Sequence, residues 1–174
     1  MAQLSKFAET VHYICHKADP EKLGAIRLNK ILWYADTIMY RATGESITGE
    51  RYVKKRHGPV PKDISKALKN LGKEGKIRVD GADVPGKMKK YVSLSEADTA
   101  PFCKEEVDLL NSLLEIICNN HTAASISEMS HDMIWDAAKP DEEIPMCAVL
   151  AARPGVITKE DQKWADKIIS ERSA

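Results

Sequence analysis

The sequence has no uninterrupted run of apolar residues long enough to cross a membrane. A spanning helix needs about 18 or more consecutive apolar residues, and every hydrophobic stretch here is interrupted earlier by polar or charged side chains. The first 19 residues include Glu9 and alternate polar with apolar positions, so they lack the apolar core of a signal peptide. We therefore expect a cytoplasmic protein without a membrane partner.

The sequence also lacks the short motifs of common catalytic and nucleotide-binding sites. It contains no HExxH metal motif, no nucleophile elbow and no glycine-rich loop with phosphate-binding spacing. His12, Cys15 and His16 could share one helix face as metal ligands, but no fourth ligand lies nearby and Cys15 also fits an apolar stripe. We expect no enzyme activity, no cofactor and no metal site.

Cysteine is scarce and shows no paired spacing. A free thiol set in a helical core pattern behaves as a small hydrophobic side chain, so we expect reduced thiols at all four positions, Cys15, Cys103, Cys118 and Cys147. The chain has 174 residues, of which 43% are hydrophobic and 30% are charged. This size and composition are typical of one globular domain, which we place at residues 1–174.

The formal net charge is zero, but the two signs are segregated along the chain. Residues 51–90 hold 13 Lys/Arg and 4 Asp/Glu, a balance of +9, whereas residues 101–174 hold 7 and 14, a balance of −7. We predict that the basic middle and the acidic C-terminal part lie on different faces, so that the basic face attracts acidic partners. The simpler alternative is that both are only solvated surface.

Residues 28–61 contain the strongest pattern in the chain. Apolar side chains recur at helical spacing in one stripe, made of Leu28, Ile31, Leu32, Ala35, Ile38, Met39 and Ala42. Gly44 is suited to end this helix, and Pro59 and Pro61 then favour an extended segment that is not a central strand. We predict a central helix over 23–43 with Leu32 and Ile38 in the core.

Weaker patterns on both sides complete a fold that is α+β and predominantly helical. We expect surrounding helices at 3–18, 61–72, 102–120, 122–129, 131–138 and from 158 onward. Alternating residues at 76–80 and 89–94 predict an antiparallel β-hairpin, to which Tyr52 and Val53 could add a strand. A helix followed by a hairpin is the arrangement of a winged helix. Residues 145–152 fit either a helix or a buried strand.

Several short motifs follow one another in a recognisable order. They are the run KILWYAD at 30–36, Gly44, the run ITG at 47–49, Tyr52, the run GPVP at 58–61, the run SEMSHD at 127–132, and Trp135. Their combination resembles the Panacea domain, the SocA-like antitoxin family, over residues 5–140. Residues 141–174 would then be a helical extension. One departure is Arg56-His57, where the family often has an apolar or aromatic pair.

The resemblance implies a bacterial, phage-associated antitoxin of a toxin–antitoxin system. Its partner would be a cognate toxin protein, inhibited directly or handed to a protease or chaperone. The partner-binding candidates lie on and beside the segment 48–61; they are Trp33, Tyr34, Thr48, Arg51, Tyr52, Arg56 and His57. We expect the other motif residues to be structural, namely Lys30, Asp36, Gly44, Gly49, Gly58, Pro59, Val60, Pro61, His131 and Trp135. Asp36 should accept a hydrogen bond from the Thr48-Gly49 turn.

A different hypothesis comes from the lysines of the predicted third helix. Lys62, Lys66, Lys69 and Lys73 are spaced by four, three and four residues, so they line one outer face of that helix, next to the predicted hairpin. This arrangement favours a winged-helix-like regulator that binds nucleic acid. Against this hypothesis, the basic segment has few aromatic residues and no arginine-rich recognition helix. We therefore rank nucleic acid behind a toxin protein as the expected partner.

Overall fold

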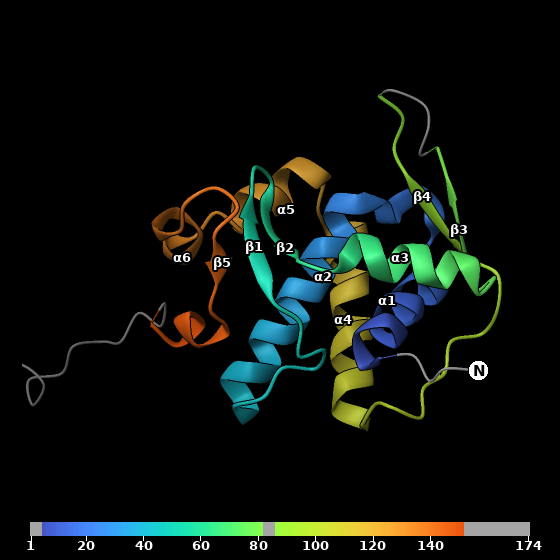
Figure 1. Cartoon of the computed structure of the whole chain (residues 1–174), viewed down its shortest axis with the longest axis horizontal. Coiled ribbons are helices and arrows are strands. Elements are labelled where there is room, and N and C mark those ends of the chain that lie inside the picture. Colours follow the sequence, from blue (N-terminus) through green and yellow to red (C-terminus); the bar gives the residue numbers. More distant parts are fainter. Residues whose placement is uncertain (1–4, 82–85, 152–174) are drawn as a thin grey trace, which may run out of the picture.

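The computed structural model describes residues 5–81 and 86–151, and it is a predominantly helical α+β fold, as predicted (Figure 1). Its helices are α1 (Lys6–Lys17), α2 (Pro20–Thr43), α3 (Ile64–Lys73), α4 (Lys104–Asn120), α5 (Ala123–Met129), α6 (Met133–Ala137) and the short 3-10 helix η1 (Met146–Leu150). Its strands are β1 (Tyr52–Lys55), β2 (Gly58–Pro61), β3 (Ile77–Asp80), β4 (Lys90–Ser93) and β5 (Glu143–Ile144). None of the described helices is both long and apolar enough to span a membrane.

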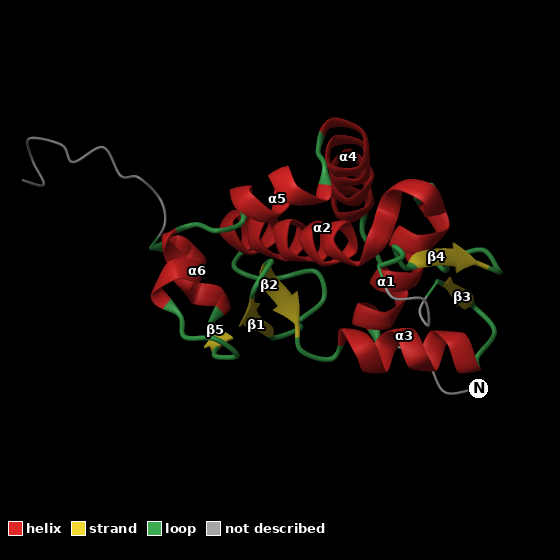
Figure 2. Cartoon of the chain, turned by 90° about the horizontal axis from the view of Figure 1, so that it is seen from above, coloured by secondary structure: helices red, strands yellow, loops and turns green. Residues whose placement is uncertain are grey.

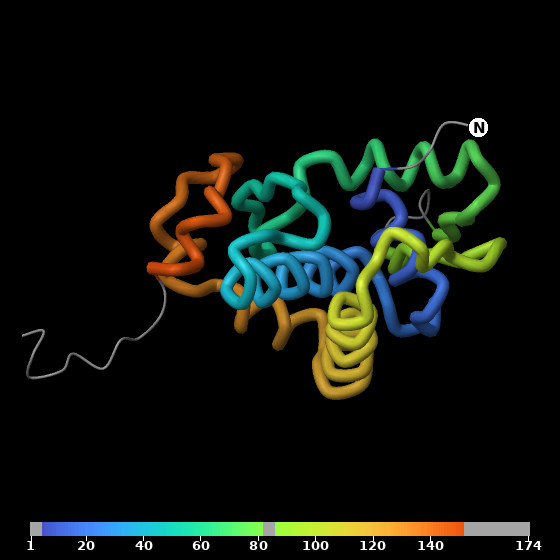
Figure 3. Tube along the Cα trace, turned by 90° about the horizontal axis from the view of Figure 1, so that it is seen from below, coloured from blue at the N-terminus to red at the C-terminus, as the bar shows by residue number. Residues whose placement is uncertain are grey.

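Helix α2 lies at the centre of the molecule. Figures 2 and 3 show α4 and α5 on one side of it, and β1, β2 and α3 on the other. The Asp19 side chain caps a first turn that begins at Pro20, and a kink at Gly24, where φ is 57°, separates this turn from the long helix that runs on to Thr43. Gly44 ends the helix in the left-handed conformation, with φ of 84°, as predicted.

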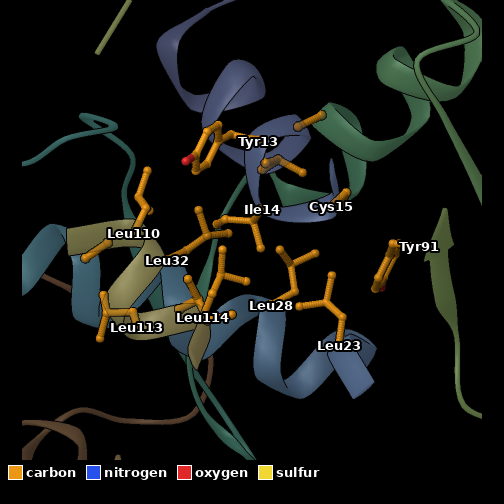
Figure 4. Packing of buried hydrophobic residues seen from close by; sticks show 14 of the residues in the cluster. Tyr13, Ile14, Cys15, Leu23, Leu28, Leu32, Tyr91, Leu110, Leu113 and Leu114 are labelled. Atoms are coloured by element: carbon orange, nitrogen blue, oxygen red, sulfur yellow. The ribbon is translucent and has the colours of Figure 1, made fainter. Parts of the chain in front are cut away.

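The main core forms where α1, α2, α4 and strand β4 meet. Figure 4 shows side chains from these four elements pointing toward one another, among them Ile14, Leu28, Leu32, Leu110 and Tyr91. Burying such side chains is worth about 1.5–3 kcal/mol each. A second, smaller core lies at the other end of α2 and consists of Trp33, Tyr52, Ile134, Ile144 and Val149.

The apolar stripe of α2 is buried from Leu28 to Ala35, whereas beyond it Ile38 and Ala42 are exposed and Met39 is half-buried. Leu32 is fully buried, as predicted, whereas 40% of the Ile38 surface is exposed, so its assignment to the core was wrong. At 3.6 residues per turn, Ile38 lies about 120° around the helix from Leu32. It therefore stands at the edge of the stripe, and its side chain is left partly open to solvent.

The strands form two separate small sheets. Strands β3 and β4 pair as the predicted antiparallel hairpin. Tyr52 and Val53 do not join that hairpin, because β1 pairs with β2 on one side and with β5 on the other, in the order β2-β1-β5. β2 occupies an edge, as its prolines require, because a proline has no N–H to donate to a second neighbour.

The C-terminal helices differ in detail from the prediction. Helix α6 begins at Met133 instead of 131, because Asp132 caps it: the Asp132 carboxylate accepts from the N–H groups of Ile134 and Trp135. The Ser130 hydroxyl is already donated to the carbonyl of Ser127. The ambiguous segment at 145–152 contains the 3-10 helix η1. The helix predicted from 158 onward lies outside the described residues.

Candidate partner-binding site

The turn between β1 and β2 presents three consecutive basic side chains to solvent. Lys55, Arg56 and His57 are all exposed, and Arg51 is exposed just before β1. These positions include three of the predicted partner-binding residues. Two others, Thr48 and Tyr34, are half-buried. The turn is therefore the part of the predicted site that another protein can reach.

Trp33 and Tyr52, which we had also placed among the partner-binding residues, lie in the interior. Tyr52 has no exposed surface, Trp33 has 2%, and their rings meet edge to face with centroids 5.0 Å apart. A protein that docks on the folded domain does not reach either ring. Their packing in the second core indicates that they stabilise the β1–β2 hairpin from the inside of the domain.

A buried carboxylate holds the loop before β1 to helix α2. Oδ1 of Asp36 accepts from the backbone N–H of Thr48 at 2.9 Å, which confirms the bond expected from the sequence. Oδ2 accepts from the Thr48 hydroxyl and, at 2.7 Å, from the phenol of Tyr52. Burial raises the pKa of Asp36, and the donors from Thr48 and Tyr52 act in the opposite direction. Burial and the adjacent Asp36 raise the pKa of Tyr52 well above its usual value, so the phenol keeps its proton as a donor.

A buried lysine lies beneath the start of β2. Lys30 is 1% exposed, and its Nζ donates a long hydrogen bond of 3.5 Å to the carbonyl of Pro59. Burial lowers the pKa of this amine to about 7. Pro59 and Gly58 are themselves buried. Lys30 on α2 and the GPVP motif of β2 therefore pack against each other in the interior, next to the turn.

Two side chains from α5 and α6 hold the turn from the other side. The Ser127 hydroxyl donates to the carbonyl of His57 at 3.0 Å, and the indole N–H of Trp135 donates to the carbonyl of Lys55 at 3.1 Å. Both bonds end on backbone atoms, so they set the path of the turn and leave its side chains free to point outward.

The Trp135 ring is covered on both faces. The imidazole of His131 stacks on it with centroids 3.9 Å apart and an interplanar angle of 14°. The Lys54 ammonium lies 4.0 Å from its centroid and also donates to the carbonyl of Ala138 at 2.9 Å. Lys54 was missed by the sequence analysis, because one lysine in a charged run carries no spacing signal. Trp135 was found only through the family motif.

One protein-family model matches the part of the chain that contains these residues. The model described as "Antitoxin SocA-like, Panacea domain" matches residues 28–136, more than half of the chain. The chain belongs to this family. The matched range of the Panacea domain includes Lys30, Asp36, the whole β1–β2 hairpin, Ser127 and Trp135. No curated protein and no solved structure matches the chain.

A shallow recess lies beside the turn of this Panacea domain. It has a volume of about 350 Å³ and is lined by Lys54, Lys55, Arg56, Trp135, Pro140 and Asp141. The Lys55 ammonium is paired with the Asp141 carboxylate across it. An aromatic wall with a basic rim is suited to an acidic or amphipathic protein segment, because arginine and tryptophan are enriched among the energetically dominant residues of interfaces.

Ion pairs join this end of the basic middle to the acidic part of the chain. Glu143 on β5 lies 3.6 Å from Arg51 and 3.9 Å from Lys62. The prediction that the two parts lie on different faces therefore fails around the β1–β2–β5 sheet. Lys66, Lys69 and Lys73 on α3 form no ion pair with any carboxylate of residues 5–81 and 86–151, and for this helix the separation of the two parts stays a prediction.

Of the three residues weighed as metal ligands, His12 and Cys15 are buried and His16 is half-buried. His12 is buried with its Nε2 3.2 Å from the Ser93 hydroxyl. Burial raises the pKa of the Cys15 thiol to about 12, which keeps it protonated and makes it a poor metal ligand. Within the described ranges, no three His, Cys, Asp or Glu residues form a cluster that could hold a metal ion.

Proposed function

We propose that this Panacea domain is a cytoplasmic antitoxin that neutralises a toxin protein by direct binding. The binding surface would be the turn surface, which we define as Arg51, Lys54, Lys55, Arg56, His57 and Trp135. The observation that carries the proposal is the anchoring of an exposed basic turn by buried or backbone-directed contacts from three helices, α2, α5 and α6. The family of the domain supports a protein as the partner.

The rigidity of the turn favours binding for an entropic reason. A loop that is ordered before a partner arrives does not lose that conformational freedom on binding, so more of the interaction energy appears as affinity. Its positive side chains would steer a partner that carries an acidic patch, which mainly raises the association rate. The exposed Arg56 guanidinium is then the natural central contact, and Trp135, covered by His131 and Lys54, supports the turn from beneath.

The buried ionisable groups support a role in binding and not in catalysis. Lys30, Asp36 and Tyr52 have at most 1% of their surfaces exposed, so a substrate cannot touch them without opening the domain. Their hydrogen bonds are directed to the loop before β1 and to the start of β2. Each group therefore stabilises the support of the turn surface.

Co-expression with the toxin encoded beside this protein tests the proposal. Arg56→Ala and His57→Ala should reduce rescue from the toxin, and loss of a central contact should weaken binding by about 30-fold, equivalent to about 2 kcal/mol. Arg78→Ala is the matched control, because Arg78 is an exposed arginine on strand β3, in the other sheet. Tyr52→Ala is unsuitable, because it would remove a core side chain.

The abundance of the toxin separates the two modes of neutralisation. Direct inhibition leaves the toxin level unchanged while its activity falls, whereas delivery to a protease or chaperone lowers the level itself. Unchanged affinity and full rescue by both Arg56→Ala and His57→Ala would place the interface elsewhere and contradict the turn surface. Turnover of a small molecule by the purified protein would overturn the proposal that the domain acts by binding.

A further inference from the structure

Helix α3 carries a row of lysines on the side that faces away from the rest of the protein. Its buried side chains are Ala67 and Leu71, which pack toward α1. At 3.6 residues per turn, Lys66, Lys69 and Lys73 fall within about 60° of one another, on the opposite side of the helix from Leu71, and Lys62 lies in the turn just before the helix. All four are exposed, and the packed helix α3 sets the positions of Lys66, Lys69 and Lys73.

Three of these lysines lack a neutralising neighbour. Lys66, Lys69 and Lys73 have no carboxylate within 4.0 Å among the described residues, whereas Lys62 lies 3.9 Å from Glu143. The acidic residues of the same stretch, Asp63 and Glu74, project roughly 100° away from the row around the helix. The row of Lys66, Lys69 and Lys73 therefore presents only positive charge to the solvent.

The dimensions of the row match a nucleic-acid backbone. Lys66 and Lys73 are separated by about 10 Å along the helix axis, which is the rise of about three base pairs of duplex DNA. Each lysine is a compact point charge on a flexible stem, which suits contact with single phosphate oxygens. We propose that the α3 row of Lys66, Lys69 and Lys73 binds the phosphate backbone of duplex DNA.

The composition of the surface favours duplex DNA over a single-stranded nucleic acid and over an acidic protein. α3 has no aromatic residue, and Tyr91 of the adjoining hairpin is only 3% exposed, so there is no ring on which bases of a single strand could stack. The row also lacks the Arg, Tyr and Trp side chains that dominate protein interfaces. Its lysines are suited to phosphates, and contacts with phosphates carry no sequence information, so binding should be independent of sequence.

The β3–β4 hairpin lies next to the end of α3. Figure 1 shows the hairpin projecting from the molecule beside the C-terminal end of the helix. Lys87 and Lys89 are exposed on its described part and form no ion pair with a described carboxylate. A helix with a lysine row followed by a projecting hairpin offers two adjacent places for a duplex to touch.

The test is fluorescence anisotropy of a short duplex of random sequence, titrated with the full chain between about 50 and 200 mM salt. The slope of log K against log salt is about −0.9 for each phosphate contact, so Lys66→Gln, Lys69→Gln and Lys73→Gln together should reduce its magnitude by about 2.7. Glutamine and lysine have similar helix propensities, so the fold should survive, and circular dichroism checks this.

Two further triple variants make the result decisive. Lys17→Gln, Lys104→Gln and Lys139→Gln remove the same charge from exposed positions off the row, and they should leave most of the slope intact. Lys66→Arg, Lys69→Arg and Lys73→Arg keep the charge and should restore binding. Absence of salt-dependent duplex binding, or equal losses in both glutamine triples, would overturn the proposal. Displacement of the duplex by polyglutamate at equal charge would instead indicate an acidic protein partner.

Discussion

Gly58 lies so close to Lys30 that a Cβ atom at position 58 would come within 2.1 Å of the lysine Nζ. The same atom would come within 2.2 Å of the Ser130 hydroxyl oxygen, and the backbone at Gly58 has φ of +103°. Contact and conformation thus both require glycine. The buried lysine of α2 and the start of β2 fit together only because position 58 has no side chain.

Gly58→Ala should destabilise the domain by about 2 kcal/mol or more, from backbone strain and overpacking together. Gly49→Ala is the matched control: Gly49 also has positive φ, of +66°, but an added Cβ there would have no atom within 4 Å. Gly49→Ala should lower the free energy of unfolding by only about 1–2 kcal/mol, the cost of placing a Cβ on a left-handed backbone. Denaturant unfolding measures both. If both variants lost the same stability, the side chains of Lys30 and Ser130 would be able to move away from the added Cβ at position 58 at no energetic cost.

Lys30 should make the stability of the domain depend on pH. Burial lowers its pKa from 10.5 to about 7, so between these values the unfolded chain binds a proton that the folded chain has released. The free energy of unfolding should therefore rise with pH across that window, by up to about 1.4 kcal/mol per pH unit. Below pH 7 the lysine is charged in both states and contributes no slope.

Lys30→Met removes the amine but keeps most of the buried volume, so it should remove this rise. The measurement is urea unfolding of the parent and the variant from below pH 7 to pH 10, compared as a difference so that other titrating groups cancel. Parallel profiles would mean that Lys30 keeps its proton in the folded state.

Leu32 and Ile38 should respond very differently to truncation, although both belong to the same apolar stripe. Leu32 has no exposed surface, and Leu32→Ala should cost about 2–5 kcal/mol by opening a cavity. Ile38 is 40% exposed, so Ile38→Ala should cost less than about 1.5 kcal/mol, since less apolar area is lost from the interior. Thermal unfolding of the two variants, side by side, checks the ranking. A larger loss for Ile38→Ala would contradict the observed burial.

Local features of this protein could be predicted from the sequence, because they depend on residues within a few positions of one another. The stripe of α2, its end at Gly44 and the β3–β4 hairpin follow from the spacing of apolar residues and from the conformations that glycine and proline allow. The bond from Thr48 to Asp36 was also expected, since a short turn returns the chain toward the helix. The motifs at 30–61 and 127–135 pointed to the family.

Tertiary structure alone decided which of the motif residues meet solvent. Tyr52 and Trp33 have an apolar ring with a polar end, so their sequence pattern fits a binding surface as well as a core. They are buried because Ile134, Ile144 and Val149, some 80–115 residues away in the chain, pack against them. The same distant segment supplies Trp135 to cover Lys54. No local periodicity encodes those contacts, because they depend on where the chain returns after β2, α3, β3, β4, α4 and α5.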